Sequence, residues 1–365
     1  MTDDNSNART GRIDRRKFLA GLGTGVAAGL AGCSNEQLTA SPATDPPPVE
    51  RRVSDDDRGS PYTGVYESAI DSVAFVRGDG GSGSAFVRED YLVTNQHVVD
   101  GADEMDVRFE RGDWADADVV AADVYADLAV LSADIPEYAS PLSFVEGVPP
   151  VGTEVVALGS PFGLESSLSV GVVSGRNRSL RSPTGFAIPN TVQTDAGLDP
   201  GNSGGPLLTL DGAVTGIAVA GAGNSVGFAV SPLLARRVLP ELVESGDYDH
   251  PFLGISLQSV TPAIAEANDL RRVRGVIVVD VLSAGPSDQT LQGSDGETVV
   301  DGRSVPVGGD VIVELAGNEV TSDTDLGTIL ALELSPGDTA DAVVIRDGRR
   351  QEIEVPVGTR PEPQG

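Results

Sequence analysis

The sequence predicts an all-β body made of two barrels, followed by a smaller second domain. The chain has 365 residues, enough for two domains, and its 45 Gly and 24 Pro supply the turns that all-β folds need. Short β-type runs recur between turn signals over residues 65–245. From Pro251 to Val357 the pattern changes, so we place the second domain over residues 251–358.

Residues 1–32 predict an export signal that lies outside the fold. Arg15–Leu19 has a twin-arginine pattern, and an uncharged stretch of small and apolar residues follows it. The stretch is shorter than the roughly 20 apolar residues of a transmembrane helix. It ends in Leu30–Cys33, which resembles a lipobox, so Cys33 is the expected lipidation site. The alternative is an uncleaved N-terminal anchor.

Residues 33–64 are predicted to be a disordered tether. They are polar and rich in Pro, and they include the acidic run Asp55–Asp57. The tether would hold the folded domains away from the membrane. We therefore expect an extracytoplasmic protein, anchored through Cys33 to the outer face of the cell membrane.

The charge balance excludes nucleic acid as a partner. The chain carries 25 basic and 55 acidic residues, a formal net charge of −30, and Lys17 is its only lysine. A surface of one sign repels nucleic acid and anionic lipid. The acidic residues are spread along the chain, which disfavours the alternative of one acidic tail. The pattern favours adaptation to high salt, where the screening length falls to about 3 Å at 1 M.

The first domain, residues 65–245, is expected to contain a dozen strands and two helices. So many short strands favour a pair of barrels over alternating βαβ units. The helices are expected over Tyr66–Asp71 and over Pro232–Glu244, where apolar side chains recur on one side. The strands are expected over Ser72–Val76, Ser84–Val87, Tyr91–Thr94, Met105–Phe109, Asp118–Ala121, Leu128–Leu131, Glu154–Gly159, Leu168–Ser174, Asn190–Thr194, Gly205–Leu208, Ala213–Val219 and Gly227–Val230.

The chain contains only two histidines, which limits where a general base can lie. His97 follows an apolar strand. His250 lies in a polar link directly before Pro251, and we interpret it as a solvated linker residue. His97 is therefore the predicted base.

Ser203 is the predicted nucleophile, because glycines flank it on both sides. They allow tight backbone geometry, and the N–H groups of Gly201 and Ser203 are expected to form an oxyanion hole. A Gly-x-Ser-x-Gly pattern also fits the nucleophile elbow of α/β-hydrolases, in which an acid and then a histidine follow the serine. Only His250 follows Ser203. The order His97, acid, Ser203 is that of chymotrypsin-like proteases.

The acid of the triad is chosen among many aspartates. Asp127 is our first choice, because the apolar run after it would bury the carboxylate beside the imidazole. Asp123 also precedes a strand and is the second choice. For any single aspartate in so acidic a chain, a role in surface solubility is the alternative.

Several motifs, in the same order and spacing, resemble the HtrA/Deg family of serine proteases over about residues 65–245. The resemblance implies two perpendicular barrels with the triad between them, and ATP-independent cleavage of unfolded or misplaced proteins, often by a homotrimer. The sequence contains neither clustered metal ligands nor a phosphate loop, so we expect no cofactor. The motifs are Gly81–Phe86, Thr94–Val99, Ala126–Leu131, Gly159–Gly163, Gln193–Ala196 and Gly201–Leu207.

The same resemblance places the S1 pocket, which receives the substrate side chain before the scissile bond. Its walls are small and uncharged, so we expect a preference for small or medium apolar residues. Such residues are buried in folded proteins, which would direct cleavage to unfolded chains. The predicted wall residues are Gly197, Leu198, Ala220, Gly221 and Val226.

The second domain resembles an α+β PDZ domain. Phe252–Ile255 is similar to the carboxylate-binding loop of PDZ domains, so the N–H groups of Leu253, Gly254 and Ile255 are expected to receive the C-terminus of a peptide. The strand Ile255–Ser259 would then pair with that peptide. Residues 293–308 depart from the family pattern and are expected to be an insertion. Further strands are expected over Gly275–Val279, Asp310–Gly317 and Ala340–Arg346, and a helix over Asp323–Leu334.

The predicted function is therefore a serine endopeptidase with a peptide-binding PDZ domain. One alternative is a chaperone whose barrels hold unfolded chains with little proteolysis. Another is an α/β esterase, which the chain order and the lack of βαβ alternation disfavour. Turnover of casein by the wild type and by Ser203→Ala separates a protease from a chaperone.

Overall fold

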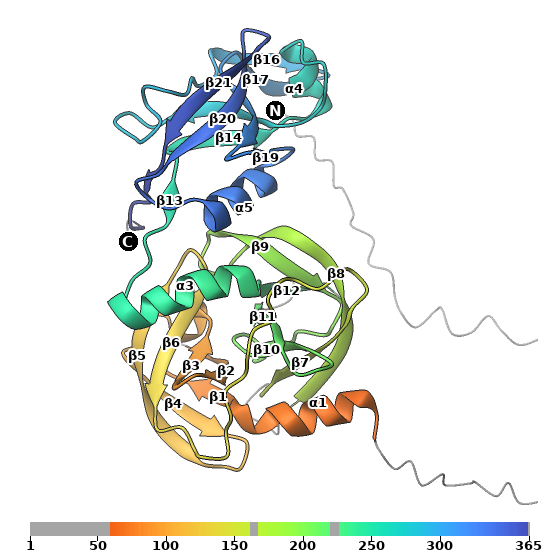
Figure 1. Ribbon diagram of the computed structural model, residues 1–365, viewed down its shortest axis with the longest axis vertical. Coiled ribbons are helices and arrows are strands. Elements are labelled where there is room, and N and C mark those ends of the chain that lie inside the picture. Colours follow the sequence, from red (N-terminus) through yellow and green to blue (C-terminus); the bar gives the residue numbers. More distant parts are fainter. Residues whose placement is uncertain (1–58, 80, 161–166, 220–225, 364–365) are drawn as a thin grey trace, which may run out of the picture. The chain divides into compact units, whose positions relative to one another are not determined.

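The structure is a computed structural model that describes residues 59–79, 81–160, 167–219 and 226–363. All of them belong to one compact unit, residues 58–365 (Figure 1). The predicted export signal, Cys33 and the tether up to residue 58 lie outside the described residues.

The first barrel is closed, with the strand order β1-β2-β3-β6-β5-β4 (Figure 1). Every neighbouring pair is antiparallel, as expected for strands joined by short turns. Val76, Val87, Leu92 and Leu131 are buried inside it. The strands are β1 (Val73–Arg77), β2 (Ser82–Arg88), β3 (Tyr91–Thr94), β4 (Glu104–Phe109), β5 (Trp114–Asp123) and β6 (Leu128–Ala133).

The second barrel is also closed, in the order β10-β11-β12-β9-β8-β7. Its hairpin β8–β9 is much longer than the sequence predicted, and shifts of register interrupt the pairing along it. The strands are β7 (Glu154–Gly159), β8 (Ser167–Arg181), β9 (Ala187–Thr194), β10 (Pro206–Thr209), β11 (Val214–Val219) and β12 (Gly227–Val230). The predicted fold class, a two-barrel domain followed by a PDZ domain, is confirmed.

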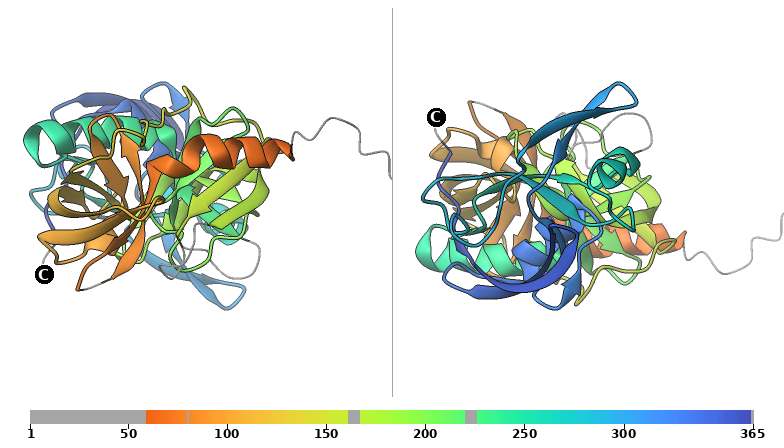
Figure 2. Two further views of the ribbon diagram at one scale, coloured as in Figure 1. Left: turned by 90° about the horizontal axis from the view of Figure 1, so that it is seen from below. Right: turned by 90° about the horizontal axis from the view of Figure 1, so that it is seen from above.

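Helix α1 (Pro61–Ala69) begins inside the stretch predicted to be a tether, so the fold begins before the expected boundary at residue 65. Ser60 accepts a hydrogen bond from the Tyr62 backbone, and Pro61 is the first helical residue, a combination that starts helices. The left view of Figure 2 shows α1 running beside the second barrel before the chain enters β1 through the short helix η1 (Ile70–Ser72).

Helix α3 (Pro232–Ser245) closes the two-barrel domain, as its one-sided apolar pattern predicted. Ser231 caps its first turn and Gly246 ends it in a left-handed conformation. Its apolar side joins a core cluster that also contains residues of both barrels. The buried residues on that side are Leu234, Ala235, Val238, Leu239 and Leu242.

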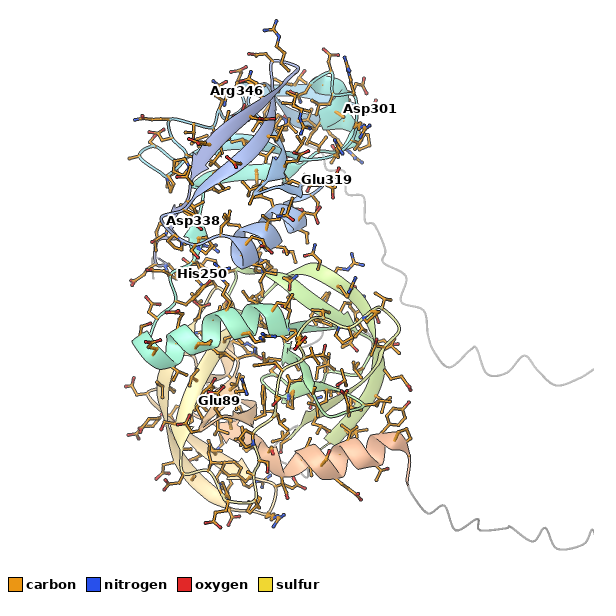
Figure 3. The ribbon with its side chains drawn as sticks, in the orientation of Figure 1. Glu89, His250, Asp301, Glu319, Asp338 and Arg346 are labelled. Atoms are coloured by element: carbon orange, nitrogen blue, oxygen red, sulfur yellow. The ribbon has the colours of Figure 1, made fainter. Side chains whose placement is uncertain are left out.

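The PDZ domain is a sheet in the order β14-β15-β18-β20-β21, with β19 paired to β18 and two helices against it. The predicted insertion is a hairpin, β16–β17, with Asp301 in its turn (Figure 3). The elements are β13 (Pro251–Phe252), β14 (Ile255–Ser259), α4 (Pro262–Ala267), β15 (Val276–Val281), β16 (Gly296–Val300), β17 (Arg303–Val307), β18 (Val311–Leu315), β19 (Asn318–Glu319), α5 (Asp323–Glu333), β20 (Thr339–Arg346), β21 (Arg349–Pro356) and β22 (Gly358–Thr359).

A search of the described residues finds no helix that is both long enough and apolar enough to span a membrane.

Candidate active site

His97, the predicted base, lies on the one-turn helix α2 (Gln96–Val99) directly after β3. The two residues before this helix hold the junction in place. Thr94 Oγ1 donates to a carbonyl of β2 at 2.7 Å, and Asn95 Nδ2 donates to the Asp127 carbonyl at 2.8 Å. The imidazole is therefore carried by the end of a buried strand rather than by a free loop, which limits its movement.

Asp127, the predicted acid, is fully buried and contacts His97 through both carboxylate oxygens. His97 Nδ1 lies 2.9 Å from Oδ1 and 2.9 Å from Oδ2, and the His97 backbone N–H donates to Oδ1 at 3.0 Å. Ser182 Oγ donates to Oδ2 at 2.9 Å. Asp127 has a left-handed backbone (φ 54°), which usually costs a residue with a Cβ about 1–2 kcal/mol. The turn before β6 thus holds the carboxylate beneath the imidazole.

Ser203, the predicted nucleophile, lies in the turn that leads into β10. The residue after it, Gly204, has φ 85°, and a Cβ there would lie 2.1 Å from the Ser84 carbonyl oxygen. Only glycine fits such a position. The turn is therefore pressed directly against strand β2 of the first barrel.

The Ser203 turn belongs to the second barrel, and Ser84 of β2 joins it to the first. The Ser84 backbone N–H donates to the Ser203 carbonyl at 2.7 Å, and its hydroxyl donates to the Gly201 carbonyl at 2.7 Å. A Cβ on Gly83 would lie 2.7 Å from Val98 Cγ2 and 2.8 Å from the Ser203 carbonyl oxygen. Helix α2, which carries His97, and the Ser203 turn therefore approach each other at Gly83.

The N–H groups of Gly201 and Ser203 have no backbone or side-chain acceptor among the described residues. The carbonyl of Gly201 is bonded to the Ser84 hydroxyl, and Gly201 has φ 102°. Both donors are therefore available to a substrate oxygen, and the predicted oxyanion hole stays a prediction.

The predicted S1 residues are only partly described. Leu198 is 9 % exposed, and a Cβ on Gly227 would lie 2.7 Å from its Cδ1, so Leu198 packs across the start of β12, next to Val226. Gly197 lies near Ser169 of β8. Ala220 and Gly221 lie outside the described residues. The apolar S1 pocket stays a prediction.

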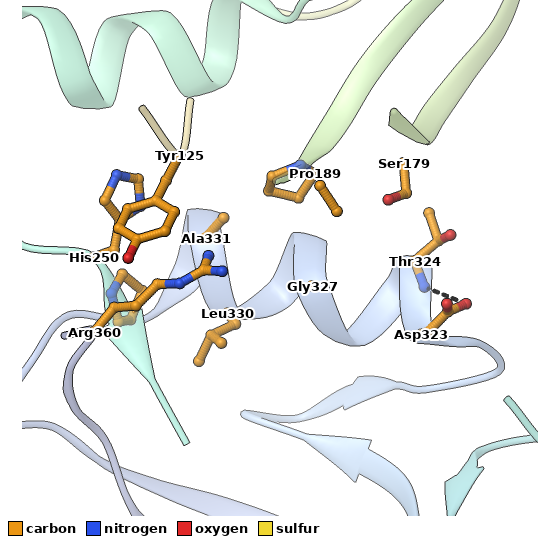
Figure 4. A pocket seen from close by; sticks show the side chains of 12 residues that line it. Tyr125, Ser179, Pro189, His250, Asp323, Thr324, Gly327, Leu330, Ala331 and Arg360 are labelled. Atoms are coloured by element: carbon orange, nitrogen blue, oxygen red, sulfur yellow. Dashed lines mark hydrogen bonds between the residues drawn. The ribbon is translucent and has the colours of Figure 1, made fainter. Parts of the chain in front are cut away.

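His250 is not the solvated linker residue that the sequence suggested. Its Nε2 lies 2.7 Å from Asp123 Oδ2, and the side chains are only 12 % and 5 % exposed. The ring meets Tyr125 and Tyr248 edge to face, at centroid distances of 5.2 and 4.7 Å. Figures 3 and 4 show its position. Asp123, the second choice for the triad acid, contacts this histidine instead.

Arg360 packs against the aromatic side chains beside this second His–Asp pair. Its guanidinium lies 3.8 Å from the Tyr125 ring centroid and 5.4 Å from that of Phe186, and its backbone N–H donates to the His250 carbonyl at 2.8 Å (Figure 4). Burial lowers the pKa of Arg360, while Tyr125 and Asp123 act in the opposite direction. No single motif indicated this cluster, because its members come from four distant segments.

The predicted carboxylate-binding loop joins β13 to β14. Leu253 is buried in the PDZ core, and the Gly254 carbonyl accepts a hydrogen bond from the Leu282 N–H at 2.7 Å. Ile255 begins β14, which pairs with β15 on one side and forms the edge of the sheet on the other. At the far end of β14, Ser259 is hydrogen-bonded to Asp323 of α5. An edge strand beside a helix is the geometry that receives an added peptide strand.

Comparison with known proteins agrees with this description. Residues 81–217 match the trypsin-like peptidase domain, and residues 251–357 match the PDZ domain. A probable periplasmic serine endoprotease of the DegP-like type from Ectopseudomonas mendocina (strain ymp) is 34% identical over 287 residues, which are 77% of this chain and 57% of that protein. One from Halomonas elongata is 34% identical over 290 residues. The chain spans little more than half of the length of these curated relatives.

Solved structures are similar over a larger share of their length. The HtrA-type protease AlgW with a tripeptide has a TM-score of 0.67 at 29% identity, covering 83% of this chain and 98% of that one. This chain thus combines a trypsin-like domain and a PDZ domain, and it is similar in fold to HtrA-type proteases.

Proposed function

We propose that this chain is an ATP-independent serine endopeptidase that cleaves unfolded or misplaced proteins outside the cytoplasm. The observation that carries the proposal is the contact of His97 Nδ1 with the buried carboxylate of Asp127, beside a glycine-lined serine turn. A carboxylate on Nδ1 leaves Nε2 free to take a proton, which is the tautomer that a serine protease needs.

The reaction follows from these groups. His97 removes the Ser203 proton as Oγ attacks the peptide carbonyl, and Asp127 stabilises the imidazolium that forms. The N–H groups of Gly201 and Ser203 hold the oxyanion, and a single donor of this kind contributes about 2.7–4 kcal/mol. His97 then protonates the leaving amine. Water attacks the acyl-enzyme with His97 again as the base, and Ser203 recovers its proton.

Two regions of the molecule, the predicted S1 pocket and the PDZ domain, support the proposed substrate class. Leu198 and Val226 favour a small or medium apolar residue before the scissile bond, and such residues become accessible when a protein unfolds. The PDZ domain is proposed to bind the C-terminus of a peptide, with Leu253, Gly254 and Ile255 at the carboxylate. Its edge strand β14 would pair with the peptide backbone.

We also propose where the protein is located in the cell and how its copies assemble. The twin-arginine pattern and Cys33 support export followed by lipid anchoring on the outer face of the membrane. The net charge of −30 supports work at high salt. A homotrimer follows from the resemblance to HtrA proteases. Membrane fractionation of Cys33→Ala tests the anchor, and sedimentation at molar salt tests the assembly.

Ser203→Ala tests the proposed function. At molar salt the wild type is expected to degrade casein and to react with a fluorophosphonate at Ser203, as mapped by mass spectrometry. Ser203→Ala should lose both properties, whereas Ser245→Ala, at the exposed end of α3, should keep both. Equal casein turnover by the wild type and Ser203→Ala would remove the protease assignment and leave a chaperone that binds unfolded chains.

A further inference from the structure

Few groups stabilise the negative charge of the Asp127 carboxylate. It is fully buried, and in the described part of the chain its only ion-pair partner is His97. Two of its hydrogen bonds come from His97 itself, from Nδ1 and from the backbone N–H. The third, 2.9 Å from the Ser182 hydroxyl, is the only one that another described residue supplies. A buried carboxylate that loses a donor is destabilised in its charged form.

Ser182 comes from the other barrel. Asp127 and His97 belong to the first barrel, whereas Ser182 directly follows β8 of the second barrel, which also carries Ser203. The bond from Ser182 to Asp127 therefore joins the half of the site that holds the base to the half that holds the nucleophile.

The turn over residues 182–186 directs the Ser182 hydroxyl. The Ser182 backbone N–H donates to the Phe186 carbonyl at 2.8 Å, which closes the turn. The Thr184 N–H donates to Ser182 Oγ at 3.3 Å. Because Ser182 Oγ accepts a hydrogen bond from the Thr184 N–H, its own single proton is available to Asp127, whose carboxylate can only accept.

Two further contacts fix the turn against the segment before Asp127. Thr184 Oγ1 donates to the Val124 carbonyl at 3.0 Å, and the Phe186 ring meets the Tyr125 ring edge to face at 4.7 Å. These contacts lie on either side of the hydrogen bond between Ser182 and Asp127, and together they fix the distance between the two residues.

We propose that Ser182 is a positioning residue for the catalytic carboxylate. Its hydrogen bond keeps Asp127, and through Asp127 the His97 ring, in the orientation that reaction with Ser203 of the second barrel requires. This inference rests on the proposed protease function. It assigns Ser182 no contact with the substrate.

The test compares Ser182→Ala, Ser182→Thr and Ser179→Ala in the full-length protein at molar salt. Ser182→Ala removes the hydroxyl and is expected to lower kcat on casein about 10- to 100-fold with KM nearly unchanged, because a hydrogen bond to a charged group acts on the reacting arrangement and not on substrate binding. Ser182→Thr keeps the hydroxyl and should recover most of kcat. Ser179→Ala removes the hydroxyl of an exposed serine on the adjoining strand, β8, and is the matched control, expected to stay within about threefold of the wild type.

A spectroscopic measurement separates positioning from a general loosening of the fold. With only two histidines, the downfield N–H proton signals of the two His–Asp pairs can be assigned by comparison with His97→Ala and His250→Ala. Ser182→Ala should shift or broaden the His97 signal and leave the His250 signal unchanged. Ser179→Ala should leave both unchanged.

Three outcomes decide the inference. If Ser203→Ala keeps casein turnover, the proposed protease function fails. If Ser203→Ala is inactive but Ser182→Ala matches the wild type in kcat and in the His97 signal, only the role of Ser182 is overturned. If Ser182→Ala and Ser179→Ala lose kcat equally and Ser182→Thr restores nothing, the loss comes from a general disturbance of the hairpin and the inference is again wrong.

Discussion

The chain contains two buried His–Asp pairs whose carboxylates lie four residues apart, and they use opposite nitrogens of the ring. His97 meets Asp127 through Nδ1, and His250 meets Asp123 through Nε2. Nδ1 is the nitrogen nearer the backbone. A carboxylate on Nδ1 leaves the outer nitrogen, Nε2, available to a substrate or a serine, whereas a carboxylate on Nε2 occupies that outer position.

The surroundings of the two pairs differ as well, because one ring is partly exposed and the other is enclosed by aromatic side chains. The His97 side chain is 20 % exposed, and its helix α2 approaches the glycine-lined turn of Ser203 at Gly83. His250 is enclosed by Tyr125 and Tyr248, and Arg360 lies on the outer side of Tyr125. A buried imidazole–carboxylate contact is therefore no evidence of catalysis by itself. The free nitrogen and what it faces decide the function.

The largest expected difference is in activity after removal of each ring. His97→Ala should lower kcat on casein by about 10⁶-fold, because the nucleophile loses its base. His250→Ala should stay within about tenfold, since its ring touches no part of the proposed reaction. Initial rates at molar salt measure both. Equal losses in the two variants would mean that the pairs do not differ in function and that our assignment of the base is wrong.

The second largest difference in activity is expected between variants of the two carboxylates. Asp127→Asn is expected to reduce kcat by about 10⁴-fold, because the amide stabilises the wrong tautomer of His97. Asp123→Asn keeps the shape of the second pair and should change kcat by less than tenfold. Steady-state rates of both variants, with folding checked by circular dichroism, give the comparison. A large loss in Asp123→Asn with little loss in Asp127→Asn would reverse the two roles.

The sequence predicted the elements better than the contacts between them. Strand Ile255–Ser259 has the predicted bounds, because its apolar pattern and the preceding glycine are local signals. His97, Asp127 and Ser203 were found because each lies in a distinctive motif. The roles of these three residues remain a proposal until variants are measured.

The contacts that sequence reasoning missed join distant segments. Ser182 precedes a proline in a turn-forming stretch, which indicates a loop and nothing more. Its hydrogen bond to Asp127 depends on how far the long hairpin β8–β9 reaches across to the first barrel. Likewise, His250 has polar neighbours in sequence but a buried partner 127 positions away. Local composition cannot show burial produced by another segment.

The smallest expected effect concerns stability, and here the order of the two histidines reverses. After loss of the His97 ring, Asp127 keeps donors to both oxygens, the His97 backbone N–H on Oδ1 and the Ser182 hydroxyl on Oδ2. After loss of the His250 ring, the Ala126 N–H, at 2.5 Å on Oδ1, is the one hydrogen-bond donor that the described residues still supply to Asp123.

His250→Ala therefore leaves a buried carboxylate oxygen without its partner and removes two aromatic contacts. It should lower the free energy of unfolding by about 1–3 kcal/mol, more than His97→Ala does. Urea denaturation at constant molar salt, followed by circular dichroism, measures both variants against the wild type. If His97→Ala proved the more destabilising of the two, the second pair would not be the structural one, and the contrast drawn between the free nitrogens would lose its energetic support.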